Sequence, residues 1–185
     1  MASIIDSNSE AGYSGDLNIQ DNHPSDAPGL NSAGGEAFTI PTSAKTITGA
    51  KFYLKKSGSP TGNATFQVYA ATGTIGTNAT PTGAALGTSG NLDLTTVTTS
   101  FALYELTFGT PIDVTGGSDY CVVMVNPASG VDSGNYPIVG YTGNTHAGNL
   151  THFWNTAWAS NSSLDVAFYL YGTITTGGSF LLNFV

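Results

Sequence analysis

The feature that most constrains this chain is the strict alternation of side chains between residues 46 and 71. Phe52 and Leu54 occupy every second position of the first run, and Phe66 and Val68 do the same in the second run. A period of two places one row of side chains in a core and the other row toward solvent. Between the runs, the sequence SGSPTGN supplies the proline and glycines that turns require. The pattern predicts two long strands joined as a hairpin.

Similar strand patterns return at residues 36–40, 99–108, 120–125 and 164–171, and no window shows the helical spacing of apolar residues. Charged residues make up only 9% of the chain, against about 25% in typical soluble domains. The sequence therefore predicts an all-β fold, an antiparallel jelly-roll β-sandwich of about eight to ten strands. The continuous apolar run at 120–125 predicts a central strand that is covered on both faces, with Cys121 as a buried core residue.

The chain divides by composition into three parts. Residues 1–35 are polar and predict an extended N-terminal arm, residues 36–174 predict the sandwich, and residues 175–185 predict a glycine hinge followed by a short apolar C-terminal tail. An apolar tail of strand length suits strand addition to a neighbouring subunit, and the alternative is a last strand on its own sheet. The apolar residues of the tail are the assembly candidates, namely Phe180, Leu181, Leu182, Phe184 and Val185.

The charge of the chain excludes several classes of partner. Twelve acidic residues against four lysines give a net charge of −8, and there is no arginine. Binding to nucleic acid or to an anionic membrane surface needs a basic surface, so neither is expected. No run reaches the roughly 18 apolar residues of a membrane span. The first residues, MASIIDSNSE, lack the basic and apolar regions of a secretory signal, so we expect synthesis in the cytoplasm.

The sequence offers no catalytic motif. His23 lies in the polar arm, whereas His146 and His152 are expected as solvent-facing loop histidines, six positions apart and without a partner cysteine. The acidic residues, Glu36 and Asp165 among them, fall mostly at predicted strand ends and turns, where Asp commonly serves turn formation. We therefore predict no enzyme activity, no metal and no cofactor. Calcium bound by loop oxygens stays open, without EF-hand spacing.

Aromatic side chains are concentrated between residues 136 and 158. Exposed aromatic faces can stack on sugar rings, while the nearby asparagines Asn144, Asn149 and Asn155 can hydrogen-bond to hydroxyl groups. The alternative is that the two tryptophans fill one end of the sandwich. The glycan-binding candidates are Tyr136, Tyr141, His152, Trp154 and Trp158.

Several segments together resemble a widespread jelly-roll domain found in bacteriophage structural proteins and in anchored bacterial surface proteins, which is similar to carbohydrate-binding sandwiches. The similarity spans residues 35 to 172. The segments that carry it are GEAFTI at 35–40, ITGAKFYLKKSGSPTG at 47–62, FQVYA at 66–70, PTG at 81–83, YELTF at 104–108, GSDYCVV at 117–123 and DVAFYLYG at 165–172. The resemblance implies no catalytic residues.

Together with the missing signal peptide, this resemblance favours the viral members. It implies a non-catalytic virion structural protein, a capsid decoration or head-fibre protein on the outside of a tailed phage. The implied partners are copies of the chain itself, with a trimer as one option, and a major capsid or other virion protein. Two alternatives stay open: a glycan-binding adhesion module, and a subunit of an extracellular filament assembled by strand exchange.

Overall fold

The computed structural model describes residues 2–20, 31–154 and 156–175. These residues form two seven-stranded sheets in which every pair of neighbouring strands is antiparallel. Across the described ranges the other regular structure is two 3₁₀ turns, η1 (Glu10–Gly12) and η2 (Leu94–Thr96). The predicted antiparallel β-sandwich is confirmed. No described helix is long and apolar enough to cross a membrane.

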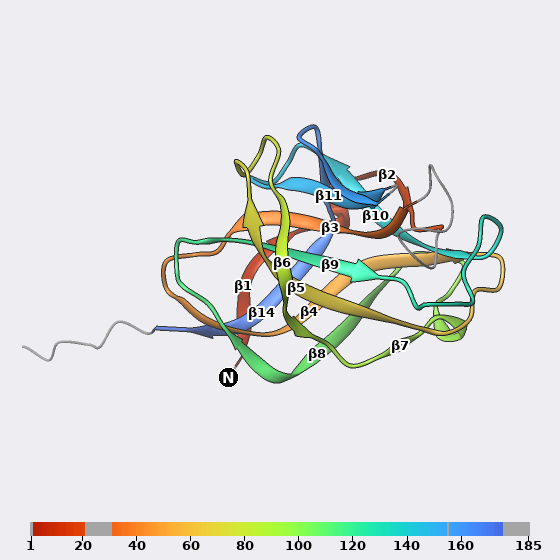
Figure 1. Ribbon diagram of the computed structural model, residues 1–185, viewed down its shortest axis with the longest axis horizontal. Helices are drawn as coiled ribbons and strands as arrows, with labels where there is room; N and C mark the ends of the chain where they lie inside the picture. The colour runs from red at the N-terminus through yellow and green to blue at the C-terminus, as the bar shows by residue number, and fades with distance from the viewer. Residues whose placement is uncertain (1, 21–30, 155, 176–185) are drawn as a thin grey trace, which may run out of the picture.

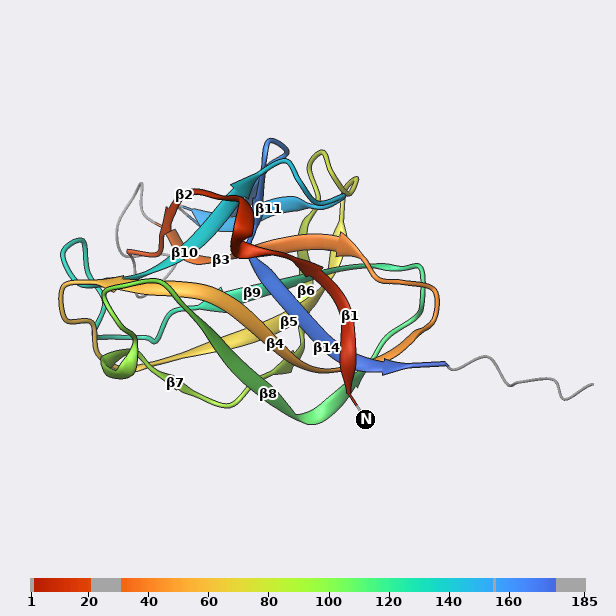
Figure 2. The ribbon, with the colours of Figure 1, turned by 180° about the vertical axis from the view of Figure 1, so that it is seen from behind.

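The first sheet is built around one long strand, β4. Its strands are β1 (Ser3–Asn8), β2 (Tyr13–Asn18), β4 (Ala44–Ser57), β8 (Ala102–Asp113), β10 (Tyr136–Gly143), β13 (Leu164–Val166) and β14 (Phe168–Ile174). Strand β4 pairs with β8, and also with β14 along one part of its length and β10 along another. Strand β1 then pairs with β14, and β2 and β13 pair with β10. Figure 2 shows this sheet toward the viewer.

The second sheet has β9 near its centre. Its strands are β3 (Asn31–Thr39), β5 (Asn63–Thr72), β6 (Thr80–Thr88), β7 (Leu92–Asp93), β9 (Asp119–Val125), β11 (Asn149–Trp154) and β12 (Ala157–Asn161). The strand order is β12-β11-β3-β9-β5-β6, and β7 pairs with β5. In Figure 1 this sheet lies in front of the first.

Strand β9 is buried on both faces, as predicted. On its inner face, Val122 and Met124 belong to the main core between the sheets. On its outer face, Cys121 and Val123 form a second, smaller cluster that Trp158 covers. Cys121 is a free thiol, and burial raises its pKa, so it is a core residue as expected.

The predicted hairpin of residues 46–71 is wrong, although both of its strands exist. Strands β4 and β5 lie in opposite sheets, so the residues between them cross from one layer to the other. The rings of Phe52 and Phe66 meet edge-on across the core, with their centroids 4.7 Å apart. Alternation of side chains identifies the buried face of each strand. It does not tell whether the next strand pairs in the same sheet or packs in the opposite sheet, because the alternation is the same in both cases. Phe38 and Phe168 make a similar contact at 5.8 Å.

The predicted N-terminal arm is also corrected within the described residues. Strands β1 and β2 belong to the first sheet, and β3 begins at Asn31, before the expected domain boundary at residue 35. This polar segment needs few apolar anchors, because pairing with β14 and β10 satisfies its backbone groups while Ile5 and Ile19 enter the core.

The predicted last strand, residues 164–171, is interrupted at Ala167, where the backbone N–H donates to the Gly140 carbonyl at 3.0 Å. The chain changes partner here, because β13 pairs with β10 and β14 pairs with β4. The assembly candidates Phe180, Leu181, Leu182, Phe184 and Val185 lie outside the described residues, as does His23.

Candidate functional site

The structure does not bring the five predicted glycan-binding residues together. Tyr136 and Tyr141 lie on β10 in the first sheet, where both are half-buried against the main core. His152 and Trp154 lie on β11, and Trp158 lies on β12, in the second sheet. The set therefore divides between two sheets.

The two tryptophans lie on opposite faces of the β11–β12 pair. Trp158 is directly opposite Phe153, and their rings meet edge-on at 5.2 Å. Trp158 also contacts Tyr69 at 5.9 Å and covers the cluster around Cys121. It is therefore a packing residue. Trp154 is directly opposite Ala157 and is 45% exposed.

Trp154 lies against a fixed polar partner. Its indole stacks with the His152 ring at a centroid distance of 6.0 Å and an interplanar angle of 27°. Nδ1 of His152 lies 2.6 Å from Oδ1 of Asn31, whose amide nitrogen donates to the backbone. Burial lowers the pKa of His152, so the neutral ring donates from Nδ1 and presents Nε2 as an acceptor. His152 is thus half-buried on a strand and is not the solvent-facing loop residue predicted.

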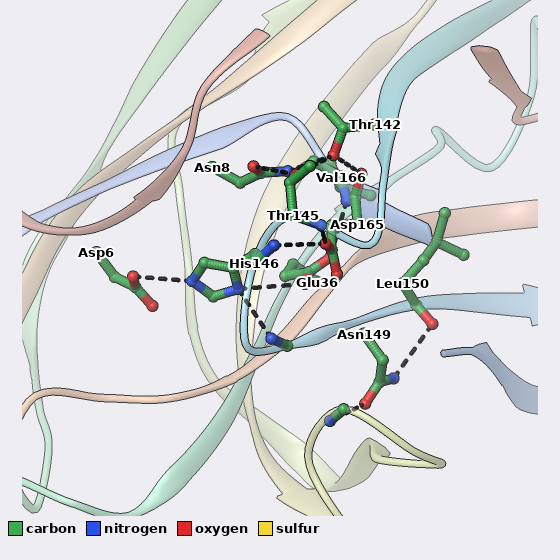
Figure 3. Close-up of polar contacts among 12 residues, drawn as sticks. Asp6, Asn8, Glu36, Thr142, Thr145, His146, Asn149, Leu150, Asp165 and Val166 are labelled. Atoms are coloured by element: carbon green, nitrogen blue, oxygen red, sulfur yellow. Dashed lines mark hydrogen bonds and ion pairs between the residues drawn. The ribbon is translucent and has the colours of Figure 1, made fainter. Parts of the chain in front are cut away.

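His146 is the centre of a buried polar cluster (Figure 3). It is also not solvent-facing, since its side chain is only 15% exposed. Gly148 N–H lies 3.0 Å from Nδ1, and Nε2 donates to Oδ1 of Asp6 at 3.1 Å. Burial opposes a charge on the ring, but the contacts with Asp6 and Glu36 outweigh it and raise the pKa of His146 to about 10. Oε1 of Glu36 lies 3.5 Å from Nδ1. The ring thereby links β1, β3 and the loop between β10 and β11.

Two fully buried carboxyl groups complete this cluster. Oδ2 of Asp165 accepts the backbone N–H groups of Thr145 and His146, at 2.6 and 2.7 Å. Oε2 of Glu36 accepts Val166 N–H at 2.8 Å. Among the described residues no donor reaches the second oxygen of either carboxyl group. Burial raises the pKa of Glu36 to about 8, so that its carboxyl group is protonated at neutral pH.

Asn8 joins the same cluster from β1. Its amide nitrogen donates to Oγ1 of Thr142 at 2.9 Å and to the Val166 carbonyl at 3.0 Å, and its oxygen accepts from Thr145 at 3.0 Å. These bonds hold β1 against β10 and β13. Figure 3 shows Asn8 and Asp6 approaching the loop from the same side.

The geometry of this cluster suits a structural role. Glu36 and Asp165 are fully buried within strands, so the prediction that acids such as these serve turns is wrong for both. Neither is placed to meet a substrate. In the described part of the chain, no group of three or more His, Cys, Asp or Glu side chains is arranged to hold a metal ion. Composition gave no signal for the cluster, because Asp6, Glu36, His146 and Asp165 are far apart in sequence.

A surface group that sequence reasoning missed lies on the outer face of the first sheet. Tyr13, Tyr53 and Phe101 form what we call the aromatic layer, and Phe101 stacks on Tyr53 at 4.7 Å. The layer covers Gly140, where a Cβ atom would come within 2.9 Å of Tyr53. The outward position of Tyr53 was readable from the alternation, but the other two rings come from distant segments.

Comparisons with known proteins place few constraints on the chain. No protein-family model matches it, and no curated protein sequence matches it. A solved structure of the cysteine protease and lectin-like domains of Cwp84, a surface layer associated protein of Clostridium difficile, aligns with 12% identity and a TM-score of 0.48. The alignment covers 76% of this chain and 32% of that chain. A likeness this distant says nothing of the function of the present chain.

Proposed function

We propose that this chain is a non-catalytic carbohydrate-binding module that contacts sugar through Trp154. The observation that carries the proposal is an exposed indole stacked on an imidazole that Asn31 holds in place. A pyranose ring has an apolar C–H face that stacks on an indole, and its hydroxyl groups need nearby donors and acceptors. Nε2 of His152 supplies an acceptor beside the indole.

The absence of catalysis is part of this proposal. Glycoside hydrolysis needs a pair of accessible carboxyl groups on either side of the scissile bond. Glu36 and Asp165, the fully buried acids, instead satisfy backbone N–H groups inside the sandwich. We therefore expect retention of sugar without turnover.

We extend the proposal to the setting of the module, the surface of a virion, as the sequence resemblance implies. The support is that resemblance together with a net charge of −8, which disfavours binding to the nucleic acid inside a particle. Purified phage particles probed with an antibody to this chain would test the setting directly. Labelling of the particle surface supports it, and labelling confined to the host cell envelope contradicts it.

The test of sugar binding compares the replacement of each of the two tryptophans by alanine. Trp154→Ala should abolish retention of short glycans on an array, while its free energy of unfolding stays within about 0.5 kcal/mol of the parent because the side chain is exposed. Trp158→Ala should instead lower the free energy of unfolding by about 2 kcal/mol or more, because it opens the cluster around Cys121.

Trp154→Tyr serves as the rescue variant, since it keeps an aromatic face at the same position. It should restore part of the retention. The proposal fails if the parent chain retains no glycan, or if Trp154→Ala retains as much as the parent.

A further inference from the structure

The aromatic layer has the geometry of a preformed binding surface. Tyr13 comes from β2, Tyr53 from β4, and Phe101 from the residue before β8. Tyr13 lies 5.0 Å from Phe101 and 6.1 Å from Tyr53, so the three rings form one contiguous group. Tyr13 is 42% exposed, and nearby Leu103 is 38% exposed. A contiguous exposed apolar patch with a polar border commonly marks an interaction site.

Charged side chains fix one border of the layer. Nζ of Lys55 lies 4.5 Å from the Phe101 centroid and 2.8 Å from Oδ2 of Asp16. The Tyr13 hydroxyl donates to the other oxygen of Asp16 at 2.5 Å, and this bond raises the pKa of Tyr13 to about 12. The phenol therefore stays neutral, and the layer is held in one arrangement before any ligand arrives.

A second ion pair lies farther along the same face. Nζ of Lys51 is 2.9 Å from Oε2 of Glu105 and 5.2 Å from the centroid of the Tyr171 ring. All four lysines of the chain lie on β4, and the two that border the layer each have a carboxylate partner. The face therefore combines apolar rings with paired donors and acceptors, and these pairs carry no net charge.

We propose that the outer face of the first sheet is a second sugar-binding surface, one that takes an uncharged polysaccharide chain. This inference rests on the proposed carbohydrate-binding function. Flat rings match the C–H faces of pyranose units, and each lysine–carboxylate pair offers a donor and an acceptor to neighbouring hydroxyl groups. An acidic chain would have to displace Asp16 and Glu105 from the lysines, so local charge favours a neutral one.

Strand addition does not suit this surface. The layer lies above the middle of the sheet, where Tyr53 pairs with Leu103 on β8 and its N–H donates to the Ala167 carbonyl. The backbone groups beneath the rings are thus already satisfied, and an added strand would need a free edge. Recognition at this face must proceed through side chains.

The experiment uses the full chain and measures affinity for soluble neutral polysaccharides, a mixed-linkage glucan and a galactomannan, with polygalacturonate as the acidic comparison. Phe101→Ala and Tyr13→Ala should each weaken binding to a neutral chain by about tenfold or more. Tyr13→Phe keeps the ring and should retain most of the affinity. Leu86→Ser, which changes a 49% exposed apolar side chain on β6, is the matched control and should bind like the parent.

Thermal melting checks that each variant folds. If Phe101→Ala does not fold, Tyr13→Ala still tests the aromatic layer. The inference is supported if the layer variants lose the neutral chain while Trp154→Ala still binds it. If Trp154→Ala alone loses binding, the inference fails and the proposed function stands. A preference of the parent for polygalacturonate overturns the inference. The inference is also overturned if the parent is an oligomer without sugar affinity and the layer variants convert it to a monomer.

Discussion

At the scale of single residues, Glu36 has an unusual environment for an acidic side chain. It is fully buried in β3, one of its oxygens accepts Val166 N–H, and the other has no donor among the described residues. An ionised carboxylate in this position would face Asp165 without enough compensating bonds. Protonation resolves the conflict, because a neutral carboxylic acid has a much smaller cost of burial.

This protonation predicts a pH dependence that one substitution should remove. The pKa of Glu36 rises from 4.5 to about 8 on folding, so between these values the folded chain holds a proton that the unfolded chain has released. The stabilisation from this group is complete below pH 4.5 and is lost as the pH rises toward 8, by about 1.4 kcal/mol per pH unit. Glu36→Gln mimics the neutral acid, so its free energy of unfolding should lack this part of the decline and keep only the part above pH 6.5 that the raised pKa of His146 contributes.

Urea titrations at several pH values across this window would measure both slopes. Parallel curves for Glu36→Gln and the parent would show that Glu36 is ionised in the folded chain.

At the scale of elements, the decisive feature is the crossing between β4 and β5. Each strand carries its apolar row toward the other sheet, and Phe52 and Phe66 meet in the core. A hairpin would place the same two strands side by side in one sheet. The contact between the two rings therefore distinguishes the two arrangements.

A double-mutant cycle on Phe52 and Phe66 tests this crossing. Each replacement by alanine should lower the free energy of unfolding by about 3–5 kcal/mol, because both side chains are fully buried. The pair should show a coupling of about 0.5–1.5 kcal/mol, since the rings interact directly. Thr65→Ala, on the opposite face of β5, should be additive with Phe52→Ala, and equal coupling in both cycles would contradict the arrangement.

At the scale of the whole molecule, the open question is self-assembly. The assembly candidates follow the last described strand in the sequence, namely the apolar residues Phe180, Leu181, Leu182, Phe184 and Val185. Because such a segment can add to a sheet edge of a neighbour, the full chain should form a defined oligomer or polymer, and a version ending at Gly178 should be monomeric.

Size-exclusion chromatography with light scattering would compare the two versions at equal concentration. A variant of the full-length chain, in which Leu181 and Phe184 are both replaced by serine, is the control, and it should behave like the truncated version. If both versions are monodisperse monomers of equal stability, the tail is not an assembly element, and the strand-exchange filament is excluded.

For the segments with clear alternation or a continuous apolar run, the sequence by itself determined that they are strands and which faces are buried. Phe52, Phe66 and the run around Cys121 are where alternation and continuous apolarity placed them, because the pleat of a strand is a local property of the backbone. It did not determine that residues 3–18 add two strands to a sheet, since that depends on partners more than a hundred positions away.

The tertiary structure alone decided which residues meet. Trp154 and Trp158 are four positions apart, yet strand pairing puts one on the surface and the other against Tyr69. Asp6, Glu36 and His146 become neighbours only when three separate elements pack together. The physical reason is that strand faces follow from neighbouring residues, whereas sheet order and side-chain clusters follow from contacts between segments remote in sequence.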